Sequence, residues 1–148
     1  MNTAACKNAD SVNRSCETSD EPGKICLINL DFLFDYVGEN FHDKLFSLIR
    51  EKGLTDVEVY KRAGMDRKLF SKIRNNPAYH PKKSTVLILA IALKLDLQET
   101  KEFLRSAEYA FSASSERDLI VQYFISHGEY DLKTINNALS VYGQQALR

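Results

Sequence analysis

The sequence predicts an all-α protein, and three observations support this fold class. Only three Pro and six Gly interrupt the 148 residues, which is few for a fold built from many short strands and turns. From residue 41 onward, apolar residues recur every three or four positions, which is the period of a helix with one buried face. Ser, Thr or Asp precedes several of these runs and Gly follows them, as is typical of helix ends.

The first 40 residues differ from the rest of the chain. Residues 1–24 are rich in Asn, Ser, Thr, Asp and Glu, and we expect a disordered polar tail there. Residues 25–40 form an apolar and acidic linker or docking segment. Its stretch Ile25–Val37 alternates like a strand, which would need a partner from another chain, but its apolar spacing also suits a helix face. We favour a short segment packed on the following domain over a docking peptide.

Residues 41–110 are expected to form a domain of five helices. The first helix ends at Lys52-Gly53, where a cation and a glycine favour a helix C-terminus. Thr55 and Glu58 have the spacing of a capping box, so a second helix should span Asp56–Ala63.

A third helix should follow a tight turn at Gly64, a residue that tolerates the positive φ which such a turn requires. Asp66 is the expected N-cap, and the helix should run to about Asn75. Its inward-facing positions are Leu69, Phe70 and Ile73.

The last two helices of this domain should complete its core. We expect Ser84 to cap a fourth helix, Thr85–Leu95, which is apolar around most of its girth and therefore central. A fifth helix should follow Asp96 and span Gln98–Glu108. The inward candidates around it are Leu97, Phe103, Leu104 and Ala107.

Residues 111–148 are predicted to form a helical hairpin that packs on this domain or on a partner. Its first helix follows Ser115 and ends near Gly128, and its second follows Asp131 and ends at Gly143. The apolar positions assigned to the hairpin are Leu119, Ile120, Tyr123, Phe124, Leu132, Ile135, Leu139 and Tyr142.

The net charge of zero hides an uneven distribution. Residues 1–40 carry three Lys/Arg and seven Asp/Glu, for a net charge of −4. Residues 41–95 carry twelve and five, for +7, and residues 96–148 carry five and eight, for −3. A basic middle third between acidic ends creates a local field that favours an anionic partner.

Several function classes find no support in the sequence. Cys6, Cys16 and Cys26 are ten residues apart and form no CxxC, so we expect reduced thiols and no metal site. The longest apolar run, Val86–Leu93, is too short to span a membrane, and residues 1–14 lack the apolar core of a signal peptide, so we expect a cytoplasmic location. With no nucleophile–base set, close carboxylate pair or Gly-rich phosphate loop, we expect neither catalysis nor a cofactor.

The stretch Leu45–Leu97, continuing toward Tyr109, resembles the lambda repressor/Cro (XRE-like) helix-turn-helix family in the order and spacing of its residues. The resemblance implies a repressor-type domain in which the helix at residues 66–75 enters the major groove of double-stranded DNA. The predicted hairpin lies outside the matching stretch. The matching features are Ile49–Thr55, Val59, Ala63, Gly64, Met65, Phe70, Ile73 and Ala90–Leu97.

The third helix and its surroundings carry the residues for this role. Between Lys61 and Lys83 there are eight Lys/Arg against one acid, Asp66, and such cations on an exposed face suit phosphate contacts. The resemblance matches Arg67, Lys68 and Lys72 to base readers and Asn75 to a phosphate-side position. The predicted base contacts are Arg67, Lys68, Ser71 and Lys72; the predicted phosphate contacts are Lys61, Arg62, Arg74, Asn75, Lys82 and Lys83.

Two positions in the second helix depart from the family pattern. Asp56 stands at the start of the helix, where the family usually has a Gln that braces the next helix and touches a phosphate. Tyr60 stands at a close-packed position where the family favours Ala, so it must either splay the helices or turn its hydroxyl outward. These departures affect DNA recognition more than they affect the fold.

The sequence therefore supports two main hypotheses of function. The first is a transcription regulator that binds double-stranded DNA, with the hairpin or residues 25–37 supplying a homodimer contact. The alternative is a protein-interaction adaptor in a bacterial signalling or defence system, with Leu30–Tyr36 or the hairpin holding a protein partner. In a third arrangement, the acidic N-terminus covers the basic helix until DNA displaces it. The alternative to all three is that the cations have no binding role and form only a solvated surface.

Overall fold

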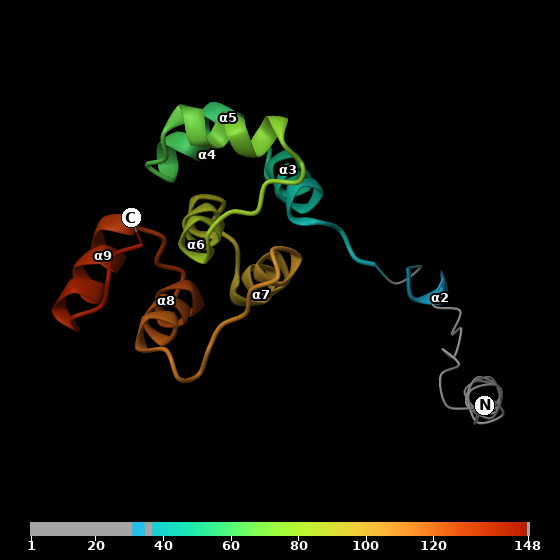
Figure 1. Ribbon diagram of the computed structural model, residues 1–148. Coiled ribbons are helices and arrows are strands. Elements are labelled where there is room, and N and C mark those ends of the chain that lie inside the picture. The colour runs from blue at the N-terminus through green and yellow to red at the C-terminus, as the bar shows by residue number, and fades with distance from the viewer. Residues whose placement is uncertain (1–30, 35–36, 148) are drawn as a thin grey trace, which may run out of the picture. The chain divides into compact units, whose positions relative to one another are not determined.

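A computed structural model of the chain describes residues 31–34 and 37–147 (Figure 1). These residues form helices joined by turns and loops, with no strand among them, so the all-α class is confirmed for this part of the chain. The chain divides into two units, Met1–Val37 and Gly38–Arg148. In the first unit, the single helical turn α2 spans Asp31–Phe34, so these four residues follow the helical alternative. The predicted polar tail and the three cysteines lie outside the described residues.

The second unit contains the helices that were expected from residue 41 onward, with boundaries close to the predicted ones. None of its helices is both long and apolar enough to cross a membrane, and the same holds for α2. The helices are α3 (Phe41–Glu51), α4 (Asp56–Arg62), α5 (Arg67–Asn75), α6 (Lys83–Ala92), α7 (Leu97–Ser106), α8 (Glu116–Ser126) and α9 (Leu132–Val141).

Local hydrogen bonds at helix N-termini confirm the predicted starts of α4 and α5. The Thr55 backbone N–H donates to the Glu58 carboxylate at 2.8 Å, and the Glu58 N–H donates to the Thr55 hydroxyl at 3.3 Å. The backbone hydrogen bond from Thr55 also lowers the pKa of Glu58 below its usual range. At the start of α5, the Asp66 carboxylate accepts the backbone N–H of Lys68 at 3.2 Å.

Helix C-termini end on residues in the left-handed region, and glycine usually fills this place. Gly64 has φ +60° at the turn between α4 and α5, as the sequence predicts. At the end of α6 the same conformation is imposed on Lys94, with φ +52°. The Lys94 N–H donates to Ile91 O at 3.0 Å, which closes the helix. A left-handed backbone costs a non-glycine residue roughly 1–2 kcal/mol, so Lys94 is strained.

Helix α6 is the centre of the core. Every residue from Val86 to Ala92 is buried, which agrees with an apolar sequence around the whole helix. Figure 1 shows α3, α4 and α5 on one side of α6, and α7, α8 and α9 on the other. Helices α3 and α7 meet through Phe41 and Phe103, whose ring centroids are 5.2 Å apart.

The predicted start of the fourth helix was wrong. Its N-cap is Lys82, without a side-chain cap, and Ser84 lies within the first turn of α6. The first residue of the helix, Lys83, makes a tertiary contact: its ammonium group lies 2.5 Å from the carboxylate of Asp118 in α8. This carboxylate is buried and also accepts the backbone N–H of Ser112 at 2.8 Å. The contact joins the first residue of α6 to α8.

Two of the apolar residues assigned to the first hairpin helix, α8, are exposed. Leu119 and Tyr123 are 49% and 58% exposed, whereas Val121 and Ile125 are buried. Apolar residues surround most of α8, so the period of the sequence does not select one face.

Among the apolar positions assigned to the second hairpin helix, α9, Ile135 and Leu139 are buried and Tyr142 is exposed. After this helix the chain folds back, and the N–H of Leu147 donates to the side-chain oxygen of Asn136 at 3.0 Å. The Leu147 side chain is buried there, so residues beyond α9 complete the core.

Candidate functional site

Helix α5 has one buried and one exposed face. Phe70 and Ile73 are 3% and 1% exposed, and Leu69 is half-buried, as predicted for the inward side. The opposite face is polar and basic, so water and ligands can reach the full length of the helix. Its exposed residues are Arg67, Lys68, Ser71, Lys72, Arg74 and Asn75.

Contacts from α3 and α4 hold the inner side of α5. The Tyr60 ring on α4 packs against the Phe70 ring, with centroids 5.9 Å apart, so this large side chain is accommodated beside the helix as a half-buried packing residue. At the far end, His42 on α3 donates from Nε2 to the carbonyl oxygen of Arg74 at 2.9 Å. This bond satisfies one of the free carbonyls at the end of the helix. Helix α5 is therefore fixed at its centre and at its C-terminus.

Three cations of α5 are not neutralised by carboxylates among the described residues. The side chains of Arg67 and Lys68 make no hydrogen bond or ion pair there. The Lys72 ammonium lies 5.0 Å from the centroid of the Tyr79 ring, a cation–π contact that leaves its charge uncompensated. These three residues give the exposed face of α5 a positive potential.

Two of the predicted phosphate contacts are instead paired within the molecule. Arg74 forms an ion pair with Asp56 on α4, so this acid neutralises a cation of α5. Lys83 is bound to Asp118, and its side chain is only 30% exposed. Both pairings remove positive charge from the surface around α5.

The remaining predicted phosphate contacts fall into two places. Asn75 and Lys82 are exposed at the end of α5 and just before α6. Lys61 and Arg62 lie at the end of α4, where they line a separate groove with α9. The opposite flank of α4 shares a hollow with α5, so Lys61 and Arg62 are not part of the exposed face of α5.

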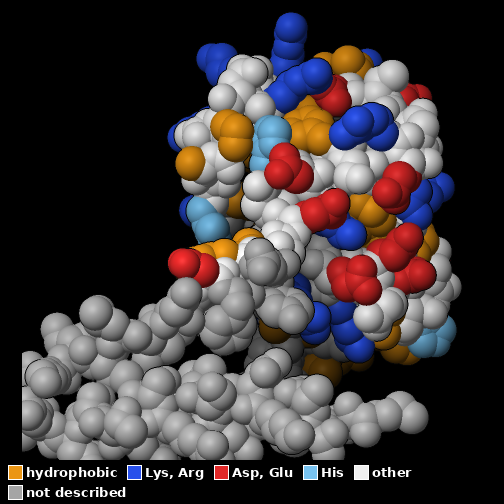
Figure 2. All heavy atoms as spheres, turned by 90° about the vertical axis from the view of Figure 1, so that its right-hand side faces the viewer, with side chains coloured by type: hydrophobic (Ala, Val, Ile, Leu, Met, Phe, Trp, Pro, Cys, Tyr) orange, Lys and Arg blue, Asp and Glu red, His pale blue; other side chains and the backbone are white. Residues whose placement is uncertain are grey.

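The surface view agrees with this distribution of charge. Figure 2 shows Lys and Arg side chains projecting at the end of the unit formed by α4 and α5, at the top of the view. Most Asp and Glu side chains on this face lie lower. On this face, the end formed by α4 and α5 is therefore richer in cations than in acids.

Sequence reasoning missed three residues that shape the charged surface. Asp118 was assigned no role, although its carboxylate binds Lys83. Lys94 and Lys133 were also given no role, although they line the same groove as Lys61. Lys94 stands just after a helix, at a position where glycine is favoured. A lysine at such a position was the local signal that could have pointed to Lys94.

No protein-family model, curated protein or solved structure matched this chain in the comparisons. Among the described residues, no group of three or more His, Cys, Asp or Glu side chains is placed to hold a metal ion. The exposed face of α5 is thus the candidate site that the sequence and the structure share.

Proposed function

We propose that the protein binds double-stranded DNA through α5, as a transcription regulator of the repressor type. In this proposal α4, the turn at Gly64 and α5 act as the helix-turn-helix of a five-helix domain, α3 to α7, that resembles the lambda repressor/Cro family. Helix α5 would lie in the major groove, where the first residues of such a helix reach base edges.

The observation that carries the proposal is the set of unpaired cations on the exposed face of α5. Arg67 and Lys68 occupy the first turn of the helix, and Lys72 lies one turn beyond Lys68. Arg and Lys side chains at these places can donate to O6 and N7 of guanine, and Ser71 can donate to or accept from either base edge. Buried Phe70 and Ile73 hold the helix so that these side chains face solvent.

Phosphate contacts would come from residues beside the reading helix. Lys82 and Asn75 are exposed and have no acidic partner among the described residues. Arg74 could contribute only after leaving Asp56, and Lys83 only after leaving Asp118. We therefore expect a small number of phosphate contacts and a shallow dependence of affinity on salt concentration.

The double substitution Arg67→Ala and Lys68→Ala tests this proposal. Each good contact of a cation with a guanine contributes about 1–3 kcal/mol, so affinity for the preferred DNA should fall at least tenfold. Fluorescence anisotropy with labelled genomic fragments across a salt series measures both the affinity and its salt slope. Because Arg67 and Lys68 are proposed to contact bases and not phosphates, the variant should lose most of its preference for one sequence and keep most of its salt slope.

A matched control removes the same charge from α7 through Lys101→Ala and Arg105→Ala, both at exposed positions. This control should bind DNA almost as the original chain does, because its cations lie outside α5. Equal reductions of affinity in the two double variants would mean that only net charge matters. Absence of salt-dependent binding by the original chain would end the proposal.

Two exposed apolar residues support a homodimer as the DNA-binding form. Leu119 and Tyr123 lie one turn apart on α8, so their exposed apolar surfaces are adjacent and a dimer interface would cover both. We expect light scattering to give twice the chain mass of 16.9 kDa, and Leu119→Ser with Tyr123→Ser to shift it toward the single chain. A single-chain mass for the unsubstituted protein at about 100 µM, well above the roughly 10⁻⁸ M of specific DNA binding, would contradict this arrangement.

A further inference from the structure

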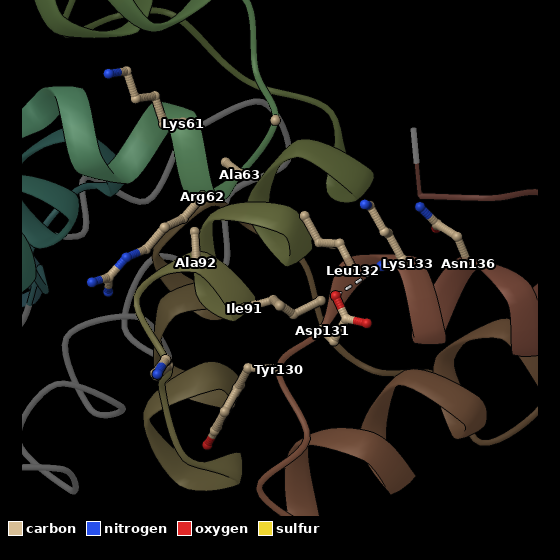
Figure 3. A pocket seen from close by; sticks show the side chains of 12 residues that line it. Lys61, Arg62, Ala63, Ile91, Ala92, Tyr130, Asp131, Leu132, Lys133 and Asn136 are labelled. Carbon is tan, nitrogen blue, oxygen red and sulfur yellow. Dashed lines mark hydrogen bonds between the residues drawn. The ribbon is translucent and has the colours of Figure 1, made fainter.

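A groove lies between α4, the end of α6 and the start of α9, away from the exposed face of α5 (Figure 3). Its volume is about 530 Å³, within the usual range for sites that bind small ligands or short peptide segments. Ala63, Ile91, Ala92 and Leu132 form its apolar floor; the first three are themselves buried, so the half-buried Leu132 is the one of the four that exposes apolar surface to a ligand.

The rim of the groove carries four cations from three helices or their ends. Figure 3 shows Lys61 and Arg62 on the α4 side and Lys133 on the α9 side. Lys94 adds a fourth cation at the end of α6. In the part of the chain that the structure describes, none of these four forms an ion pair. The groove is therefore an apolar floor with a basic rim.

The acid that lines the groove, Asp131, is already occupied. As the N-cap of α9, its carboxylate accepts the Thr134 hydroxyl at 2.7 Å and the backbone N–H groups of Thr134 and Lys133 at 3.2 and 3.4 Å. The hydrogen bond from the Thr134 side chain lowers the pKa of Asp131, so this carboxylate stays ionised as a cap. Its lone pairs serve the helix. Asp131 attracts Lys133, and Glu58 attracts Arg62, through Coulomb interactions, but among the described residues neither carboxylate forms an ion pair with these cations, so the rim can still bind a ligand.

Lys94 supplies a second, independent observation. Four helix ends place glycine in the left-handed region, whereas α7 places Glu108 there and α6 places Lys94. Strained residues of this kind persist where the side chain has a use that outweighs the strain. The side chain of Lys94 lines the groove, so its use would be to place a positive charge at the rim.

The helix ends at the groove indicate which anion fits. A compact phosphate group is best held by free backbone N–H groups at a helix N-terminus. Here α4 and α6 present their C-terminal ends, whose partial charge is negative, and Asp131 already binds the N–H groups of α9. Among the described residues, the groove therefore offers an anion Lys and Arg side chains but no free helix N–H groups. Separate carboxylates can each meet one of these cations, and apolar side chains between them can cover the floor.

We infer that this groove binds an acidic peptide segment of a partner protein, with carboxylates on Lys61, Arg62, Lys94 and Lys133 and apolar side chains on the floor. This site is independent of the proposed DNA interface. The long, mobile rim side chains give each ion pair a modest share of the affinity, and the set of four gives specificity for acidic sequences.

The experiment uses the full chain and a fluorescein-labelled peptide of sequence EELEELEE, followed by anisotropy at physiological salt. The double variant Lys94→Glu and Lys133→Glu should weaken binding at least tenfold. The control, Lys101→Glu and Arg105→Glu on α7, changes the net charge equally outside the groove and should weaken it less than threefold. A peptide with Ser in place of Leu should bind several times more weakly, because it leaves the floor uncovered.

The variant Lys94→Gly distinguishes loss of peptide binding from loss of folding. It relieves the left-handed strain, so its melting temperature should rise while its affinity for the peptide falls. No saturable binding of the peptide at 1 mM, a concentration well above the roughly micromolar affinity of weak interfaces, would overturn the inference. Equal weakening in the groove and control variants would also overturn it.

Measuring DNA binding by the same variants distinguishes a failure of the peptide inference from a failure of the proposed function. The groove variant should keep its affinity for DNA, and the Arg67→Ala, Lys68→Ala variant should keep its affinity for the peptide. If the groove variant no longer bound DNA and the peptide did not bind, the groove would belong to the DNA interface, and the peptide inference would be wrong. If the groove bound the peptide and no DNA bound anywhere, only the proposed function would fail.

Discussion

Replacing Lys83 by Met is expected to lower the free energy of unfolding by about 3 kcal/mol. The substitution leaves the Asp118 carboxylate, which is 3% exposed, without its cation at 2.5 Å. The Ser112 N–H remains as a donor, but one neutral donor does not replace an ammonium group. The value lies at the low end for a broken buried pair because Lys83 itself is partly in water. Urea unfolding followed by circular dichroism measures the change.

The neighbouring residue provides the control for this prediction. Lys82 is exposed and makes no side-chain bond among the described residues, so Lys82→Met should change stability by no more than about 0.5 kcal/mol. Adding Asp118→Leu to Lys83→Met should restore part of the stability, because an apolar pair of similar size avoids the buried charge. Equal stabilities of the two lysine variants would show that the ion pair contributes nothing.

Replacing Phe103 by Ala is expected to lower the free energy of unfolding by about 3–5 kcal/mol. The Phe103 side chain is fully buried and is the largest such side chain among the described residues. Its ring meets Phe41 across the contact between α3 and α7, so its removal leaves a cavity and ends an aromatic contact. A small domain has a total stability of about 5–15 kcal/mol, so the variant should be partly unfolded at 37 °C.

Two further variants separate the cavity from a general effect of removing a ring. Phe103→Leu keeps most of the volume and should be destabilised less than half as much as Phe103→Ala. Tyr123→Ala removes a ring that is 58% exposed and should be destabilised by about 1 kcal/mol or less. Calorimetric melting of all three variants tests the order. A destabilisation of Phe103→Ala as small as that of Tyr123→Ala would contradict the central position of this ring.

Features of the fold that depend on neighbouring residues were predictable from the sequence. The capping box of Thr55 and Glu58 and the N-cap Asp66 act within three residues, and the structure contains both sets of bonds. The inward face of α5 was predictable because Phe70 and Ile73 are apolar residues in a strongly polar helix. In α8 the same method failed, because apolar residues occur around the helix and packing against other helices selects the face.

The charged residues of the candidate site also divide into those predictable from local sequence and those that depend on tertiary contacts. That Arg67 and Lys68 are exposed follows from the period of α5 alone. That Arg74 is neutralised by Asp56, and Lys83 by Asp118, depends on how separate helices come together, and no local pattern encodes it. The start of α6 was misplaced because no capping side chain marks it, so the capping pattern of the sequence does not apply there.

The way α5 is anchored has a consequence for the evolution of the protein. Its hold on the core comes from Phe70 and Ile73, with a smaller part from Leu69. Substitutions at exposed helical positions usually change stability by less than about 0.5 kcal/mol. Apart from Arg74, which is paired with Asp56, the outward residues of α5 can therefore change with little cost to the fold, so descendants of this protein can acquire new ligand preferences one substitution at a time.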